Sequence, residues 1–167
     1  MAVHLCGAYP TAKVRFIPNW VDTDRFTPGP QPGGRQVLYV GRLVEEKNLR
    51  TLAWACRSAG ADLVCAGEGP LIDEIRSLRG NMLRAVPWEQ LPSLHRGSDV
   101  FAMVSHTEGH CKALTEAMAS GLPCVVSKAV TDGMVAWVNC LQVDPTETGI
   151  ALAIEVLMAD HGFAQKL

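Results

Sequence analysis

The amino-acid sequence predicts an α/β fold, a doubly wound and mostly parallel β-sheet, and three observations support this prediction. Short apolar runs alternate along the chain with amphipathic stretches at helical spacing. The runs are continuously apolar, which is typical of strands that are buried on both faces of a parallel sheet. Glycine stands where several of the helices should end. This succession indicates strands connected by helices that cover both faces of one sheet.

The first two strand–helix units show the pattern most clearly. Residues 36–40 form an apolar run, and Asn48 is then expected to be the N-cap of a helix that ends at Gly60. Residues 61–66 form the second apolar run, and the helix after it places apolar side chains on one face before Gly80. We therefore expect two parallel strands with two crossover helices.

The rest of the chain repeats this alternation with shorter elements. A helix is expected after Glu108, and it should stop at Gly121 because a proline follows two positions later. The remaining strands are predicted at residues 82–86, 99–104, 123–127 and 141–143, and the remaining helices at residues 89–96 and 146–158.

Composition indicates one globular domain preceded by a linker. The chain has 167 residues, and a hydrophobic content of 48% is sufficient for a closed core. Residues 1–34 contain five prolines and the pair Gly33-Gly34, which break any long element. We therefore assign residues 1–34 to an interdomain linker and residues 35–167 to the folded domain.

Charge and cysteine content exclude several classes of protein. The formal net charge is −2 without a basic stripe, so nucleic acid is not an expected partner. No apolar run approaches the ~20 residues of a membrane-spanning helix. Six cysteines without a C-x-x-C pair favour reduced thiols and a cytoplasmic location. Peripheral contact with the inner face of a membrane stays open.

Polar residues gather where the predicted strands end, which is where ligands bind in this class of fold. Arg42 and Lys47 follow the first strand, Gly67 follows the second, and residues 105–112 follow the fourth. Cations and helix-start N–H groups suit phosphate oxygens, and carboxylates accept hydrogen bonds from sugar hydroxyls. This combination indicates a nucleotide-sugar as the ligand.

Two carboxylates, Glu108 and Glu116, stand eight positions apart across a loop-to-helix junction. A glycosidase pair would need a separation of roughly 5 to 9.5 Å, whereas eight helical residues span about 12 Å, so hydrolysis is not favoured. Asp22 and Asp24 more simply form a turn than a metal site. His106 and its neighbours lack a second ligand pair at zinc spacing, so we expect no metal.

Four segments in order resemble successive motifs of the group 1 glycosyltransferases, the large family of retaining mannosyl- and glucosyltransferases with the GT-B fold. The resemblance extends over roughly residues 14–158 and implies the C-terminal, donor-binding domain, which is the Rossmann-like second half of a GT-B fold. The segments are residues 17–26, 40–48, 66–71 and 108–123.

The resemblance implies a role for each matching residue. Arg42 and Lys47 would clamp the donor diphosphate, Glu108 would contact the transferred sugar, and Glu116 would hold the ribose hydroxyls. The segment from Arg84 to Val86 would lie along the base, beside the glycine turns at Gly41 and Gly67. The loop and helix start around the phosphates would comprise Gly109, His110, Cys111, Lys112, Ala113, Leu114 and Thr115.

The resemblance also implies partners. The nucleotide-sugar would be a substrate, with no cofactor and no metal, and its sugar would pass with retention to a saccharide or lipid-linked acceptor. That acceptor would be held by an N-terminal domain or a partner chain, which we do not expect within this sequence. The family commonly has an aromatic residue and a glycine at His110 and Cys111. A non-catalytic module that binds a nucleotide-sugar or docks a partner is therefore the alternative.

Cys111 allows one further interpretation. It precedes the predicted helix, and a helix N-terminus lowers the pKa of a thiol, so it would be a reactive group. The simpler interpretation is a small filler residue. Residues 128–137 also depart from the family, because they lack its usual Gly-Gly pair and the Pro-Glu that follows.

Overall fold

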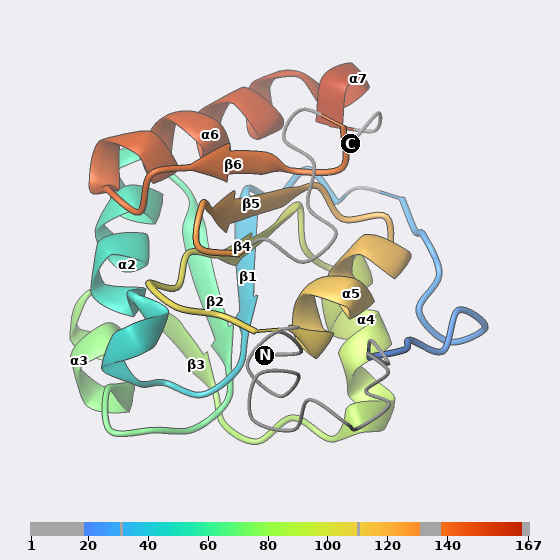
Figure 1. Cartoon of the computed structure of the whole chain (residues 1–167), viewed down its shortest axis with the longest axis horizontal. Helices are drawn as coiled ribbons and strands as arrows, with labels where there is room; N and C mark the ends of the chain where they lie inside the picture. The colour runs from blue at the N-terminus through green and yellow to red at the C-terminus, as the bar shows by residue number, and fades with distance from the viewer. Residues whose placement is uncertain (1–18, 31, 110, 131–137, 165–167) are drawn as a thin grey trace, which may run out of the picture.

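The computed structural model describes residues 19–30, 32–109, 111–130 and 138–164 (Figure 1). Within them, six strands form one sheet in the order β3-β2-β1-β4-β5-β6, and every neighbouring pair is parallel. The predicted fold class is therefore confirmed. The strands are β1 Gln36–Val40, β2 Asp62–Ala66, β3 Asn81–Leu83, β4 Val100–Met103, β5 Cys124–Ser127 and β6 Leu141–Val143.

Helices cover both faces of the sheet. Figure 1 shows α2 and α3 on one face and α4 and α5 on the other, while α6 packs beside α2. None of the helices within the described residues is long and apolar enough to cross a membrane. The helical elements are the 3-10 helices η1 Glu45–Lys47 and η2 Trp88–Gln90, and the α-helices α2 Leu49–Ser58, α3 Ile72–Ser77, α4 Leu91–Arg96, α5 Lys112–Ala119, α6 Glu147–Ala159 and α7 His161–Ala164.

Three local expectations are corrected. The third strand was expected over residues 82–86 but ends at Leu83, so the next three residues form a loop. The helix expected over residues 89–96 divides into η2 and α4, because Pro92 fits only the first turn of a new helix. Asn48 precedes α2, but its side chain makes no cap hydrogen bond to the helix backbone. It instead donates to the carbonyl oxygen of Pro145 at 3.1 Å.

The strand order reverses between β1 and β4, and this reversal positions the candidate site. The chain winds outward from β1 through β2 to β3, then returns to β4 on the other side of β1 and winds outward to β6. The two crossovers leave the sheet in opposite directions, so a crevice is expected at the carboxyl ends of β1 and β4. The residues that follow these two strands are the ones to inspect for a site.

Gly67 allows the turns after β1 and β2 to lie against each other. Its φ is +148°, and a Cβ atom there would lie 2.0 Å from the carbonyl oxygen of Gly41. The N–H of Gly41 donates to the carbonyl oxygen of Ala66 at 3.0 Å, and that of Gly67 donates to Leu83 at 3.0 Å. Only glycine fits at position 67, because any side chain would push the two turns apart.

The segment that precedes β1, assigned from the sequence to a linker, contacts the sheet domain. Phe26 is buried, and its ring meets that of His95 at a centroid distance of 5.7 Å and an edge-on angle. Asp99 accepts hydrogen bonds from the N–H groups of Gly33 at 2.7 Å and Gln36 at 2.8 Å. These contacts fix the path of the chain into β1.

Candidate functional site

Lys47 and Glu108 meet at the point where the strand order reverses. Lys47 ends η1, after β1, and Glu108 lies in the loop after β4. The Nζ atom of Lys47 lies 2.6 Å from Oε2 of Glu108. The hydroxyl of Ser105 donates to the same oxygen at 3.2 Å. Lys47 is only 8% exposed, so this pair is largely withdrawn from solvent. The fold thus joins two predicted site residues that are 61 positions apart.

Arg42 lies at the rim of the same crevice. Its side chain is 71% exposed, and its Nη2 atom donates to Oε1 of Glu46 at 2.7 Å. That carboxylate oxygen also lies 3.8 Å from Nζ of Lys47. Nothing in the sequence distinguished the two cations. In the structure, Arg42 pairs with the exposed carboxylate of Glu46, whereas Lys47 pairs with the largely buried carboxylate of Glu108.

A cavity of about 380 Å³ opens at the ends of β1 and β2, and Arg42 is in its lining, whereas Lys47 and Glu108 are not. Four predicted site residues line it, namely Gly41, Arg42, Gly67 and Val86. Arg84 does not line this cavity, and its side chain is exposed. Ala85, within the segment expected along the base, and Glu68, next to Gly67, also line the cavity. Val40, Ala66 and Leu91 complete the lining and were not among the predicted site residues.

The helix α5 begins directly after the loop that carries Glu108. Its first residues are Lys112, Ala113 and Leu114, whose backbone N–H groups have no acceptor within the helix backbone. Those of Ala113 and Leu114 donate to the side chain of Cys111. Gly109 borders open space, since a Cβ atom there would meet no atom within 4 Å. Thr115 completes this turn. His110 lies outside the described residues.

The interpretation of Cys111 as a reactive thiol is wrong. Burial raises the pKa of this thiol above its ordinary value. Hydrogen bonds from the backbone N–H groups of Leu114 and Ala113 lower the pKa but do not overcome the effect of burial. Since the thiolate is the nucleophile, a raised pKa leaves the group protonated and unreactive.

Glu116 lies one helical turn into α5 and is only 3% exposed. Burial raises the pKa of its carboxyl, and the charge of Lys112 and a hydrogen bond from the Trp88 side chain act in the opposite direction. The Nζ atom of Lys112 lies 3.7 Å from Oε1 of Glu116. A carboxylate that is buried with such partners is not the ordinary solvated helix residue that its position in the sequence permits.

The Asp22-Thr23-Asp24 stretch forms a turn. Oδ1 of Asp22 accepts hydrogen bonds from the N–H groups of Asp24 at 3.1 Å and Arg25 at 3.3 Å. Across the part of the chain that the structure describes, no group of three or more His, Cys, Asp or Glu side chains is arranged to hold a metal ion.

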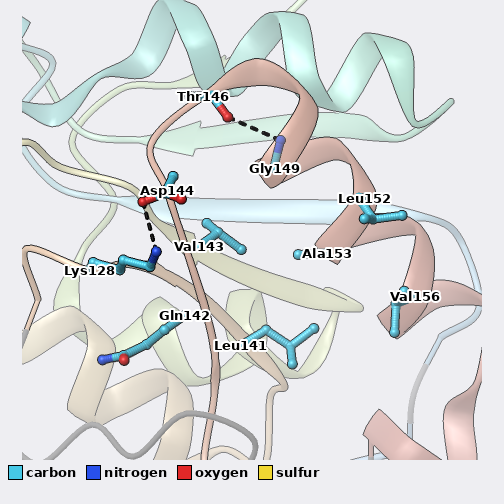
Figure 2. A pocket seen from close by; sticks show the side chains of 10 residues that line it. All are labelled: Lys128, Leu141, Gln142, Val143, Asp144, Thr146, Gly149, Leu152, Ala153 and Val156. Atoms are coloured by element: carbon cyan, nitrogen blue, oxygen red, sulfur yellow. Dashed lines mark hydrogen bonds and ion pairs between the residues drawn. The ribbon is translucent and has the colours of Figure 1, made fainter.

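An apolar groove of about 300 Å³ lies elsewhere, between β6 and α6 (Figure 2). Leu152 and Val156 of α6 face Leu141 and Val143 of β6 across it. At one end, Nζ of Lys128 pairs with Oδ1 of Asp144 at 2.9 Å. None of the residues that line this groove belongs to the predicted donor site, so the two features are distinct.

The strand order, with the Lys47–Glu108 pair at its reversal, defines a doubly wound domain, the class of fold in which ligands bind at the carboxyl ends of the strands. A family model described as "Glycosyl transferases group 1" matches residues 21–161. This match covers most of the chain, which therefore belongs to the group 1 glycosyltransferase family.

Relatives and solved structures agree with this assignment. A GDP-mannose-dependent alpha-(1-6)-phosphatidylinositol monomannoside mannosyltransferase of Mycolicibacterium smegmatis is 30% identical in an alignment that covers 90% of this chain and 48% of the relative. A crystallised C-terminal domain of a group 1 family protein of Francisella tularensis has a TM-score of 0.75 at 22% identity, and covers 88% of this chain and 92% of that domain.

Anabaena Alr3699/HepE in complex with UDP-glucose has a TM-score of 0.76 at 18% identity, over 87% of this chain and 48% of that one. At these identities the two structural likenesses show the fold alone. The chain spans less than half the length of each curated relative that it matches.

Proposed function

We propose that this chain is the donor-binding part of a glycosyltransferase that transfers a sugar from a nucleotide-diphosphate sugar to a saccharide or lipid-linked acceptor, with retention of configuration. The observation that carries the proposal is the Lys47–Glu108 pair, largely withdrawn from solvent at the strand-order reversal, together with a cavity at the neighbouring ends of β1 and β2. Membership of the family, a relative named for GDP-mannose and a structural neighbour solved with UDP-glucose support it.

The cations supply the chemistry of the leaving group. As the bond to the sugar breaks, negative charge builds up on the departing nucleoside diphosphate, and preorganised positive groups stabilise it. Lys47 acts from within the crevice and Arg42 from its rim. The N–H groups at the start of α5, which have no acceptor within the helix backbone, add partial positive charge for the same phosphates.

The carboxylates orient the sugars at either end of the diphosphate. Glu108, at the crevice, accepts hydrogen bonds from hydroxyls of the transferred sugar, and Glu116 accepts them from the ribose. The cavity beside Val86 takes the base. In this assignment the neutralising groups are side chains and backbone N–H groups, without a metal or cofactor.

The acceptor is the part of the reaction that needs residues beyond this domain. The chain spans 48% of the mannosyltransferase relative. We assign the acceptor to an N-terminal domain or a partner chain that faces the crevice across a cleft. Transfer then requires both parts, while donor binding requires only this one.

Calorimetry with UDP-, GDP- and ADP-sugars tests the proposal. We expect one of these donors to bind and to be hydrolysed slowly, with the donor's own anomer released first, as a retaining mechanism requires. Glu108→Ala should abolish this hydrolysis. Absence of heat with every donor would contradict the proposal. Tight binding without turnover, even beside an acceptor domain, would indicate the non-catalytic module instead.

A further inference from the structure

Glu116 sits in an arrangement that the motif itself does not explain. Its side chain is buried at the point where α5 passes η2. Two side chains reach it, Lys112 from the preceding turn of its own helix and Trp88 from η2. The side chain of Lys112 is about half exposed and that of Trp88 is exposed to 36%, whereas Glu116 is 3% exposed.

Trp88 also connects this cluster to the segment before β1. The guanidinium carbon of Arg25 lies 4.2 Å from the Trp88 ring centroid, and Nζ of Lys112 lies 5.9 Å from it. Phe26 packs against the same ring at 6.3 Å. Cations over an aromatic ring are attracted to its face, so Arg25 and Lys112 restrict the rotation of the indole.

We propose that Trp88 and Lys112 are positioning residues, which hold the carboxylate of Glu116 in the orientation that accepts hydrogen bonds from the ribose hydroxyls of the donor. This assignment rests on the proposed function. It adds Trp88 to the donor site and gives Lys112 a second role there.

The physical reason is that burial and hydrogen-bond acceptance make opposite demands on Glu116. An ionised carboxylate only accepts hydrogen bonds, which suits two hydroxyl donors, whereas a protonated one donates as well. Burial raises the pKa of Glu116, while Lys112 and Trp88 lower it. Arg25 lies beyond the Trp88 ring and is paired with the carboxylate of Asp22 at 3.8 Å, so Lys112 is the cation that acts on Glu116.

Ribose recognition tests the role of Trp88. UDP, GDP and ADP are each compared with their 2′,3′-dideoxy counterparts by calorimetry, and the pair whose ribonucleotide binds most tightly is used. We expect the natural chain to prefer the ribonucleotide by about tenfold, the size of one charge-assisted hydrogen bond. Trp88→Phe should reduce the ratio of ribonucleotide affinity to dideoxynucleotide affinity severalfold, while the dideoxynucleotide binds as before.

Trp54→Phe is the matched control, because Arg57 lies over that exposed ring at 5.3 Å on α2, outside the site. It should keep the full ratio. If the role of Trp88 were merely structural, Trp88→Phe would weaken the binding of the ribonucleotide and of the dideoxynucleotide equally. An unchanged ratio of the two affinities would overturn this inference and leave the proposed function intact. If the natural chain binds none of UDP, GDP and ADP, the proposed function fails and this inference with it.

The pH dependence tests the role of Lys112. Without this charge Glu116 is protonated at a higher pH, so Lys112→Met should lose ribonucleotide affinity at a higher pH than the natural chain as the pH falls. Lys112→Arg should restore the natural profile. Lys128→Met removes an exposed, paired lysine elsewhere and should change nothing. Superimposable profiles for Lys112→Met and the natural chain would overturn the role of Lys112.

Discussion

At the scale of single residues, Lys47 is the side chain on which donor binding depends most. Its ammonium is withdrawn from solvent and is already held by Glu108, so it is oriented before a ligand arrives. Because the ammonium of Lys47 is already largely dehydrated, binding of a diphosphate costs little further desolvation of this cation. The contribution of Lys47 should therefore exceed that of Arg42, which is exposed and pairs with Glu46.

Replacement of Lys47 measures this contribution. Lys47→Ala should weaken UDP or GDP binding by about 1.5–3 kcal/mol, the value of a hydrogen bond to a charged group. Calorimetry gives the change, with Lys128→Ala as a control for an exposed lysine. An affinity equal to that of the natural chain would refute the assigned role.

Glu108 competes with the diphosphate for the same ammonium. Glu108→Gln removes the carboxylate charge and releases Lys47, so UDP and GDP should bind more tightly, by roughly 1 kcal/mol or about fivefold. Donor hydrolysis should fall in the same variant, because the sugar contact is altered. Weaker nucleotide binding would show that Glu108 does not oppose the phosphates.

At the scale of elements, the close approach of the turns after β1 and β2 requires Gly67. Gly67→Ala places a Cβ atom against the Gly41 carbonyl at a positive φ, and unfolding in urea should show a loss of about 2 kcal/mol or more. Gly109→Ala is the matched control, because its Cβ atom would meet nothing within 4 Å. Equal stability of the two variants would contradict this account of the turn.

The helix α4 carries a second element-scale feature, the buried ring of His95 between Phe26 and Phe101. Neither ring nitrogen has a hydrogen-bond partner among the described residues, and burial lowers the pKa to about 4. The unfolded chain, with an ordinary pKa near 6.5, therefore binds the proton first as the pH falls. Stability should be lost between pH 6.5 and 4, by up to about 3 kcal/mol.

Urea unfolding across this pH range checks the direction in which the free energy of unfolding changes with pH. The natural chain should become less stable as the pH falls, and His95→Phe should remove that part of the slope while keeping a ring between the two phenylalanines. Identical slopes in both proteins would mean that His95 does not remain neutral in the folded state.

The elements could largely be predicted from the sequence because the central strands are continuous apolar runs. The loop after β3 could not be predicted, because Val86 is as apolar as a strand residue. Only the pairing within the sheet decides that the strand ends before it. Arg42 and Glu46 have the i, i+4 spacing of an ion pair, a signal that was present but not used. The contact of Trp88 with Glu116 joins distant segments and leaves no pattern in the sequence.

At the scale of the whole molecule, the account makes one central claim, that the donor binds where the strand order reverses. The competing location on the described surface is the apolar groove between β6 and α6 (Figure 2). The two lie on different elements and share no lining residue. A method that reports residue by residue can therefore tell them apart.

The most direct test is an NMR titration of the backbone amides with UDP and with GDP. The account predicts shifts at Gly41, Gly67 and Val86 and along residues 112–115, and these shifts should weaken in Lys47→Ala. Shifts confined to Leu141, Val143 and Leu152 and their neighbours, or no shift with either nucleotide, would contradict it.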